Sequence, residues 1–111
     1  MTVMVVGGAG FIGRRLVPLL CERGEQVVCM DINPGQASFD CFGDRVTLVR
    51  GDVTQFDDVM GHVATLQPTR LINLSYHISS DLPPHAALKL NVVGMDNCFE
   101  AARLGNVRHT V

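Results

Sequence analysis

The chain has 111 residues, and its 47% hydrophobic and 18% charged content is typical of one compact domain with a packed core. Nine Lys and Arg residues against eleven Asp and Glu residues give a formal net charge of −2, and no window gathers the basic residues into a stripe. One Tyr and no Trp leave no set of aromatic platforms for base stacking. We therefore expect a small-molecule partner and neither a second domain nor a nucleic-acid partner.

The cysteines and the N-terminus indicate the compartment. There is no C-x-x-C pair, and three of the four cysteines lie in predicted helices or strands, which is typical of buried thiols in a reducing environment. The four are Cys21, Cys29, Cys41 and Cys98. The first residues lack the basic stretch of a signal peptide, and no apolar run reaches the roughly 18 residues of a membrane helix. The sequence predicts a cytoplasmic protein without membrane contact.

Short β-branched segments alternate with helical periodicity in the first half of the chain. Strands are predicted at residues 3–6, 26–30 and 46–50. Apolar residues at helical spacing predict a helix that begins near Phe11 and ends at Gly24. Residues 33–44 form a Pro/Gly loop without a clear period.

The second half continues this alternation. Thr54 is the predicted N-cap of a helix with one apolar face, formed by Phe56, Val59, Val63 and Leu66. Strands are predicted at residues 70–74 and from residue 106 onward. Between them, Pro83 and Pro84 precede a long helix that ends at Gly105. Its predicted buried stripe is Leu88, Val92, Met95, Phe99 and Ala102.

The alternation predicts the fold class. Strands separated by helices are typical of α/β proteins with a parallel sheet. We expect one domain over residues 1–111, a Rossmann-type doubly wound sheet of about five strands in the order 3-2-1-4-5.

A glycine run follows the first predicted strand and opens the first predicted helix. It reads Gly7-Gly8-Ala9-Gly10-Phe11-Ile12-Gly13 and satisfies both G-x-G-x-x-G and G-x-x-G-x-x-G. Such glycines make a tight turn, let the backbone approach a pyrophosphate and let the helix pack on the strand, while the helix N-terminus attracts the anion. The pattern alone also fits a glycine turn without a ligand, but its place between strand and helix favours a dinucleotide site.

An acid at the end of the second predicted strand supports this interpretation. Asp31 lies 18 residues after Gly13, near the roughly 20-residue offset of a carboxylate that binds ribose hydroxyls. Because a carboxylate repels a 2′-phosphate, NAD is favoured over NADP. An ordinary turn acid is the alternative, and Arg14 and Arg15 leave room for NADP.

Two further polar positions are candidates. Asn91 lies close to the predicted buried stripe of the long helix, so its amide either bonds to backbone or faces a ligand. The Gly51-Asp52 loop follows the third predicted strand; it is either a simple turn or part of a ligand site at the carboxyl edge of the sheet.

These motifs together resemble the extended short-chain dehydrogenases/reductases, the NAD-dependent epimerase/dehydratase family that acts largely on nucleotide sugars. The resemblance runs in order over the entire chain. It rests on the glycine run, then Asp31, Gly51-Asp52-Val53, Leu71-Ile72-Asn73-Leu74-Ser75 and Asn91-Val92-Val93-Gly94-Met95.

The resemblance implies roles for individual residues. Gly7, Gly10 and Gly13 belong to the pyrophosphate loop, and Phe11 and Ile12 lie against the pyrophosphate. The adenosine ribose is bound by Asp31 and Asn33, and the adenine meets Asp52 and Val53. The end of the fourth strand lines the cofactor with Leu74, Ser75 and Tyr76, where family members commonly carry a pair of small residues after the first position. Asn91 braces that loop near the nicotinamide.

The catalytic part of the family pattern is missing. Family chemistry uses a Ser and a Tyr-x-x-x-Lys pair in which Tyr passes the proton while hydride moves to or from the nicotinamide. The one Tyr is Tyr76 and the one Lys is Lys89, so no such pair and no catalytic residue is present. The four histidines have no metal-ligand spacing. A Ser79-His77-Asp81 triad can be drawn, but nothing like a nucleophile elbow surrounds Ser79.

We therefore expect the NAD-binding N-terminal part of an epimerase, dehydratase or dehydrogenase that acts on a nucleotide sugar or a related substrate, inactive by itself because it lacks the Tyr-x-x-x-Lys pair. A stand-alone dinucleotide-binding module is the alternative, and a structural remnant without ligand is a third hypothesis. A sheet that stops at its fifth strand exposes an edge and the apolar face of the last helix, which predicts a homo-oligomer.

Overall fold

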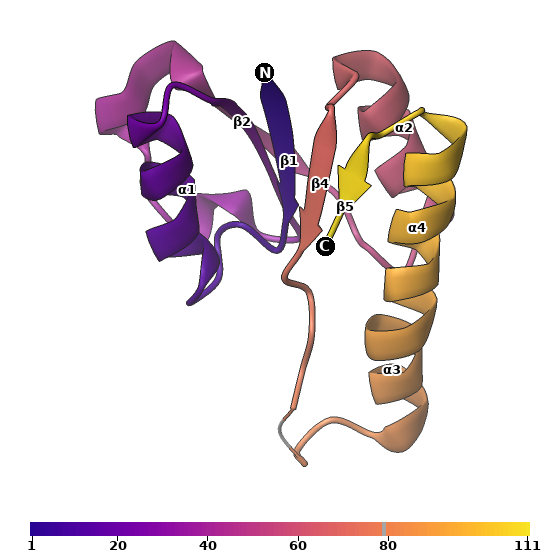
Figure 1. Cartoon of the computed structure of the whole chain (residues 1–111). Coiled ribbons are helices and arrows are strands. Elements are labelled where there is room, and N and C mark those ends of the chain that lie inside the picture. Colours follow the sequence, from indigo (N-terminus) through magenta and orange to yellow (C-terminus); the bar gives the residue numbers. More distant parts are fainter. Residues whose placement is uncertain (79) are drawn as a thin grey trace.

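Five parallel strands form one sheet at the centre of the molecule (Figure 1). The computed structural model describes residues 1–78 and 80–111. The strands are β1 (Thr2–Val6), β2 (Gln26–Asp31), β3 (Val46–Arg50), β4 (Arg70–Asn73) and β5 (His109–Thr110). Their order is β3-β2-β1-β4-β5, and every neighbouring pair is parallel. The predicted fold class and strand order are confirmed.

Helices cover the sheet on both faces. The covering helices are α1 (Gly13–Glu22), α2 (Phe56–Leu66) and α4 (Gly94–Leu104), while the short helix α3 (Pro84–Leu88) extends beyond the edge of the sheet (Figure 1). A π-helical turn, Lys89–Val93, joins α3 to α4 in one continuous helical rod. The long loop between β2 and β3 holds two short 3-10 helices, Pro34–Gln36 and Asp40–Arg45. In Figure 1, α1 lies on one side of the sheet and α2 and α4 on the other.

Two apolar cores follow from the alternation of side chains along the strands. On the α1 side, Val3 and Val5 of β1 pack with Val17 of α1. On the other side, Met4 of β1 and Leu71 of β4 pack against α2 and α4. The side chains of residues 3–6 of β1 are fully buried on both faces, which explains why this strand reads as an uninterrupted apolar run.

The start of α2 differs from the prediction. Gln55, not Thr54, precedes the first helical residue, and no side chain caps this end. The Thr54 amide and hydroxyl both donate to Asp52 Oδ1, at 2.9 and 2.7 Å, so Thr54 belongs to the preceding turn. The predicted apolar face of α2 is confirmed, because Val59 and Val63 are buried and its other two members pack on the same core.

The predicted buried stripe of the long helix is wrong for four of its five residues. Leu88, Val92, Met95 and Phe99 are each about half exposed, and only Ala102 is buried. The face that packs on the sheet instead carries mainly small residues, including Gly94, Cys98 and Ala101. A Cβ at Gly94 would lie 2.9 Å from Val53 Cγ1, so small side chains are what lets the helix approach this closely.

The cysteines follow the predicted pattern of burial. Cys21, Cys29 and Cys98 are buried, Cys41 is exposed, and all four are free thiols. Burial raises the pKa of the Cys29 and Cys98 thiols to about 12, with nearby Asp31 adding to the effect at Cys29. Over the described ranges 1–78 and 80–111, no helix has the length and apolar character needed to cross a membrane.

Candidate dinucleotide-binding site

The glycine loop turns sharply between β1 and α1. Gly7 has a φ of +78°, a backbone conformation that residues other than glycine rarely adopt. Its amide donates to the Met30 carbonyl at 2.7 Å. Gly13 begins α1 directly against the loop, where an added Cβ would lie 2.1 Å from the Gly8 carbonyl oxygen. The turn and the close helix packing that the motif requires are therefore both present.

The amino end of α1 offers free hydrogen-bond donors. Among the described residues, the backbone amides of Phe11, Ile12 and Gly13 donate to no protein acceptor, whereas the Arg14 amide bonds to the Gly10 carbonyl at 3.0 Å. The side chains of Phe11 and Ile12 are 74% and 59% exposed, so they do not shield these amides within a core. The positive end of a helix with unused N–H groups is suited to a phosphate or pyrophosphate.

Asp31 joins the glycine loop to the end of β2. It is 7% exposed; its Oδ2 accepts the Ala9 amide at 3.1 Å, and its Oδ1 accepts the Asn33 amide at 3.0 Å. Each carboxylate oxygen has room for a second donor. The carboxylate therefore stabilises the turn after β2 and lies beside the glycine loop. The side chain of Asn33 is exposed.

A cavity of about 180 Å³ opens beside Asp31 at the carboxyl edge of the sheet. Its lining comes from the ends of β1 and β2, from the loops after β3 and β4, and from the π-helical turn. The lining residues are Val6, Met30, Asp31, Ile32, Gly51, Asp52, Val53, Ser75 and Leu90. Four of the predicted cofactor-binding residues, Asp31, Asp52, Val53 and Ser75, thus surround one cavity at the edge where open α/β sheets bind ligands.

The loop after β3 is fixed from two sides. Asp52 turns its carboxylate toward Thr54, and the Asp52 amide donates to Asp58 Oδ2 at 2.9 Å. Val53 is only 5% exposed, and its carbonyl accepts the Nδ2 of Asn97 at 2.9 Å. Asn97 is a residue that the sequence reasoning missed. No sequence signal pointed to it, because the hydrophobic periodicity of the long helix predicted a different face as buried.

Replacing Asn97 with Ala should destabilise the chain by about 2 kcal/mol, because the buried Val53 carbonyl would lose its hydrogen-bond donor. The control is Asp96→Ala, one residue earlier on the exposed side of α4, which should change stability by less than about 0.5 kcal/mol. Urea unfolding followed by circular dichroism measures both values. Equal losses in the two variants would contradict a supporting role for the Asn97 amide.

The loop after β4 forms one wall of the site, and its Ser75 lines the same cavity as Asp31. The Leu74 amide donates to the Val6 carbonyl at 2.7 Å, and the Ser75 amide donates to Asn73 Oδ1 at 2.9 Å. A Cβ on Gly7 would lie 2.9 Å from Ser75 Oγ, so this wall touches the glycine loop. Tyr76 is 66% exposed. Leu74 and Ser75 therefore lie at the glycine loop, and Tyr76 extends the wall beyond it.

Asn91 holds the same loop from the long helix. Its Oδ1 accepts the His77 amide at 2.9 Å, and its Nδ2 donates to the His77 carbonyl at 2.8 Å. Asn91 occupies the centre of the π-helical turn, an irregularity that is frequent at functional sites. The Asn91 amide therefore bonds to backbone, which is one of the two alternatives that the sequence left open. These two hydrogen bonds would let Asn91 hold the loop in place, the role that the family resemblance implies.

The suggested Ser79-His77-Asp81 triad includes a residue that lies outside the described part of the chain. His77 Nε2 lies 2.8 Å from Asp81 Oδ1, but Ser79 is outside the described residues. In the part of the chain that the structure describes, no three His, Cys, Asp or Glu side chains are grouped to hold a metal ion.

Comparison with known proteins leads to the same family. The family model described as "NAD dependent epimerase/dehydratase family" matches residues 3–111. A UDP-glucose 4-epimerase of Mycolicibacterium smegmatis is 36% identical over 119 residues, which cover 100% of this chain and 37% of that protein. A dTDP-glucose 4,6-dehydratase of the same organism is 33% identical over 97% of this chain and 34% of its own length.

Solved structures agree in fold. The UDP-glucose 4-epimerase of Thermus thermophilus in complex with NAD has a TM-score of 0.82 and 29% identity, covering 96% of this chain and 35% of that one. The Bordetella bronchiseptica enzyme WbmH in complex with NAD+ has a TM-score of 0.82 and 27% identity, covering 98% and 37%. The chain thus spans little more than a third of the length of these relatives. The resemblance predicted from the sequence is confirmed, with NAD as the cofactor of that family.

Proposed function

The chain belongs to the NAD-dependent epimerase/dehydratase family, and from this membership we propose that it binds NAD(H) as the cofactor-binding part of an oxidoreductase. The reaction of the whole protein would be hydride transfer on a nucleotide sugar or a related substrate. The observation that carries the proposal is the closure of the glycine loop onto Asp31, beside the cavity at the carboxyl edge of the sheet.

Each part of the site has a physical role in this proposal. The free amides of Phe11, Ile12 and Gly13 receive the pyrophosphate. Asp31 binds the adenosine ribose through the remaining lone pairs of its carboxylate, and the exposed Asn33 contributes beside it. The adenine enters the cavity against Val53 and the loop at Asp52. The nicotinamide end follows the wall formed by Leu74, Ser75 and Tyr76.

In this proposal the cofactor and the chain have different roles in the reaction. NAD supplies hydride transfer when bound, and this chain positions it. Asn91 holds the loop after β4 in position, because its side chain hydrogen-bonds to both the amide and the carbonyl of His77. Because the chain holds one Tyr and one Lys without the Tyr-x-x-x-Lys spacing, we expect no turnover by these 111 residues alone.

Calorimetric titration with NAD tests the proposal directly. We expect one NAD per chain and weaker binding of NADP, whose 2′-phosphate would approach the Asp31 carboxylate. At a concentration 100 times the dissociation constant, NAD should stabilise the fold by about 2.7 kcal/mol by mass action. Absence of both binding heat and thermal stabilisation at millimolar NAD would refute the proposal and favour a structural remnant. Binding in a longer form that lacks any Tyr-x-x-x-Lys pair would favour a non-catalytic dinucleotide module.

Self-association is the second part of the proposal. The half-exposed residues Leu88, Val92, Met95 and Phe99 follow one another at spacings of four, three and four, which is the repeat of a helix that packs against another helix. We name these four residues the outer stripe. They lie along one continuous helical rod from α3 to α4, and we propose that a second copy of the chain covers them.

The double variant Val92→Glu/Met95→Glu should convert the associated form into monomer, because two carboxylates would have to be desolvated in the interface. Leu19→Glu is the matched control: Leu19 is an exposed leucine of α1, on the opposite side of the sheet. Sedimentation equilibrium over a range of concentrations gives the mass. A parent chain that stays monomeric at high concentration, or loss of association in both variants alike, would contradict a role for the outer stripe.

A further inference from the structure

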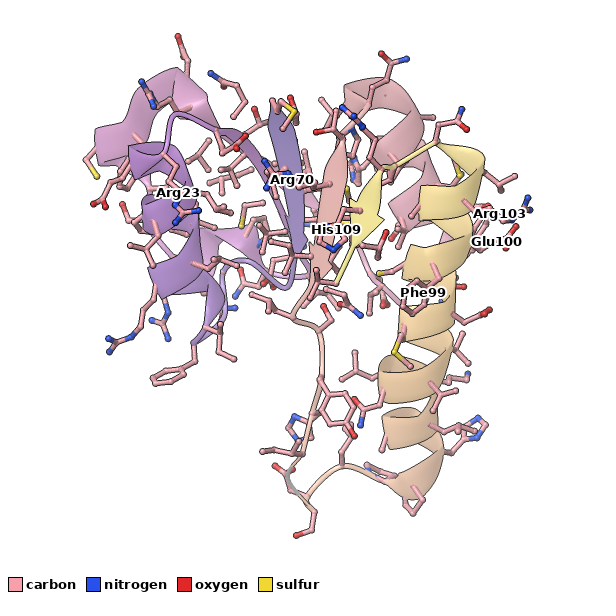
Figure 2. All side chains as sticks on the ribbon, viewed as in Figure 1. Arg23, Arg70, Phe99, Glu100, Arg103 and His109 are labelled. Carbon is pink, nitrogen blue, oxygen red and sulfur yellow. The ribbon has the colours of Figure 1, made fainter. Side chains whose placement is uncertain are left out.

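A hollow of about 220 Å³ lies at the amino edge of the sheet, away from the glycine loop. Its lining residues are Met1, Thr69, Arg70, Arg108 and His109, which begin or precede β1, β4 and β5. Arg70 and His109 are paired in register on neighbouring strands, and Figure 2 shows their side chains near one another. Because the next residue, Leu71, enters the α2 and α4 core, Arg70 faces the α1 side of the sheet.

The backbone beneath this hollow is fixed. The Thr69 amide and hydroxyl both donate to the Thr2 carbonyl, at 2.9 and 3.2 Å, and the Arg108 amide donates to the Thr69 carbonyl at 2.8 Å. These bonds join the starts of three adjacent strands. The side chains around the hollow therefore project from a rigid edge rather than from a free loop.

The charges around the hollow do not balance. Glu25 is the one described carboxylate that pairs here: its Oε1 accepts Arg70 at 2.7 Å, and its Oε2 lies 3.7 Å from the Met1 ammonium without accepting a hydrogen bond. Arg108 has no salt-bridge partner among the described residues and is exposed at the rim. Glu25 thus pairs with Arg70 and the Met1 ammonium, whereas Arg108 contributes a positive charge without a described ion-pair partner, and His109 adds a further nitrogen donor.

We propose that this hollow binds a small anion that carries a phosphoryl group. A guanidinium presents five donors in a planar fork that matches phosphate oxygens, and Arg70 uses one of its terminal nitrogens on Glu25. The anion would lie between the remaining donors of Arg70 and the unpaired side chain of Arg108. This site is separate from the proposed NAD site, because it uses the opposite edge of the sheet and none of the same residues.

The test is a titration of the isotope-labelled chain with inorganic phosphate at constant ionic strength, followed by amide NMR shifts. Saturating shifts at Thr69, Arg108 and His109 are expected, and the amides of Phe11 to Gly13 report separately on the glycine loop. Arg108→Gln should weaken phosphate binding at the hollow about tenfold, the loss expected for a charge-assisted hydrogen bond. The control is Arg23→Gln, which removes the same charge from the exposed end of α1 and should leave the affinity unchanged.

Three outcomes would overturn the inference. The first is that phosphate shifts no amide at the hollow up to tens of millimolar. The second is that Arg108→Gln and Arg23→Gln weaken binding equally, which would indicate attraction to net charge rather than to a site. The third is that only the glycine-loop amides respond, which would place all phosphate binding at the carboxyl edge.

Discussion

Replacing Gly13 with Ala should abolish measurable NAD binding and destabilise the chain by about 3 kcal/mol. The added Cβ would lie 2.1 Å from the oxygen, 2.4 Å from the carbon and 2.5 Å from the Cα of Gly8. All three atoms are backbone, so no side-chain rotation can relieve the contact. The first turn of α1 would have to move away from the glycine loop, and the free amides that the pyrophosphate needs would move with it.

Gly61→Ala is the matched control for this variant. Gly61 lies inside α2, and a Cβ there meets nothing within 4 Å. Because Ala has the higher helix propensity, this variant should be more stable by about 0.5–1 kcal/mol and should bind NAD normally. Thermal unfolding and calorimetric titration of both variants measure the two effects. A Gly13→Ala chain that keeps its affinity would show that the close helix approach is not needed for binding.

The second large effect is expected at the acid that follows β2. Asp31→Asn should weaken NAD binding by about tenfold to a hundredfold, since hydrogen bonds to a charged acceptor are worth about 1.5–3 kcal/mol. Affinity for NADP should fall much less, because the variant no longer repels the 2′-phosphate. Stability should also fall by about 1–2 kcal/mol, because an amide cannot accept both the Ala9 and Asn33 amides as the carboxylate does.

The ratio of the two cofactor affinities separates recognition from folding. Loss of stability alone would reduce NAD and NADP binding by similar factors, whereas loss of ribose recognition changes their ratio. Asp44→Asn, which removes an exposed acid from the loop before β3, controls for net charge and should leave the ratio unchanged. An unchanged ratio in Asp31→Asn would mean that Asp31 is a structural turn acid.

The sequence was sufficient to predict the sheet and the edge at which the proposed site lies. Buried parallel strands are recognisable because both faces are covered, so β1 reads as a continuous apolar run. The glycine run between β1 and α1 and the acid after β2 are local features, and the strand order brings them together. Such local features can be predicted from the sequence because they depend on backbone conformation and on the order of elements along the chain.

Contacts between distant segments were decided only by the tertiary structure. The Asn97 amide holds a carbonyl 44 residues away, and Thr54 turns back to Asp52 instead of capping α2. No periodicity encodes such pairs, because a polar side chain can satisfy its hydrogen bonds with any donor or acceptor that folding brings near.

The long helix shows the same limit most clearly. Its sequence carries two faces, one with Leu88, Val92, Met95 and Phe99 and one with small residues around Gly94 and Ala101. Hydrophobic periodicity identified the first face and predicted that it is buried. The core instead packs on the second face, because only small side chains allow the close approach to Val53 in the loop after β3. The sequence by itself determined that this helix is amphipathic, and the tertiary structure determined which face is buried against the core and which stays exposed.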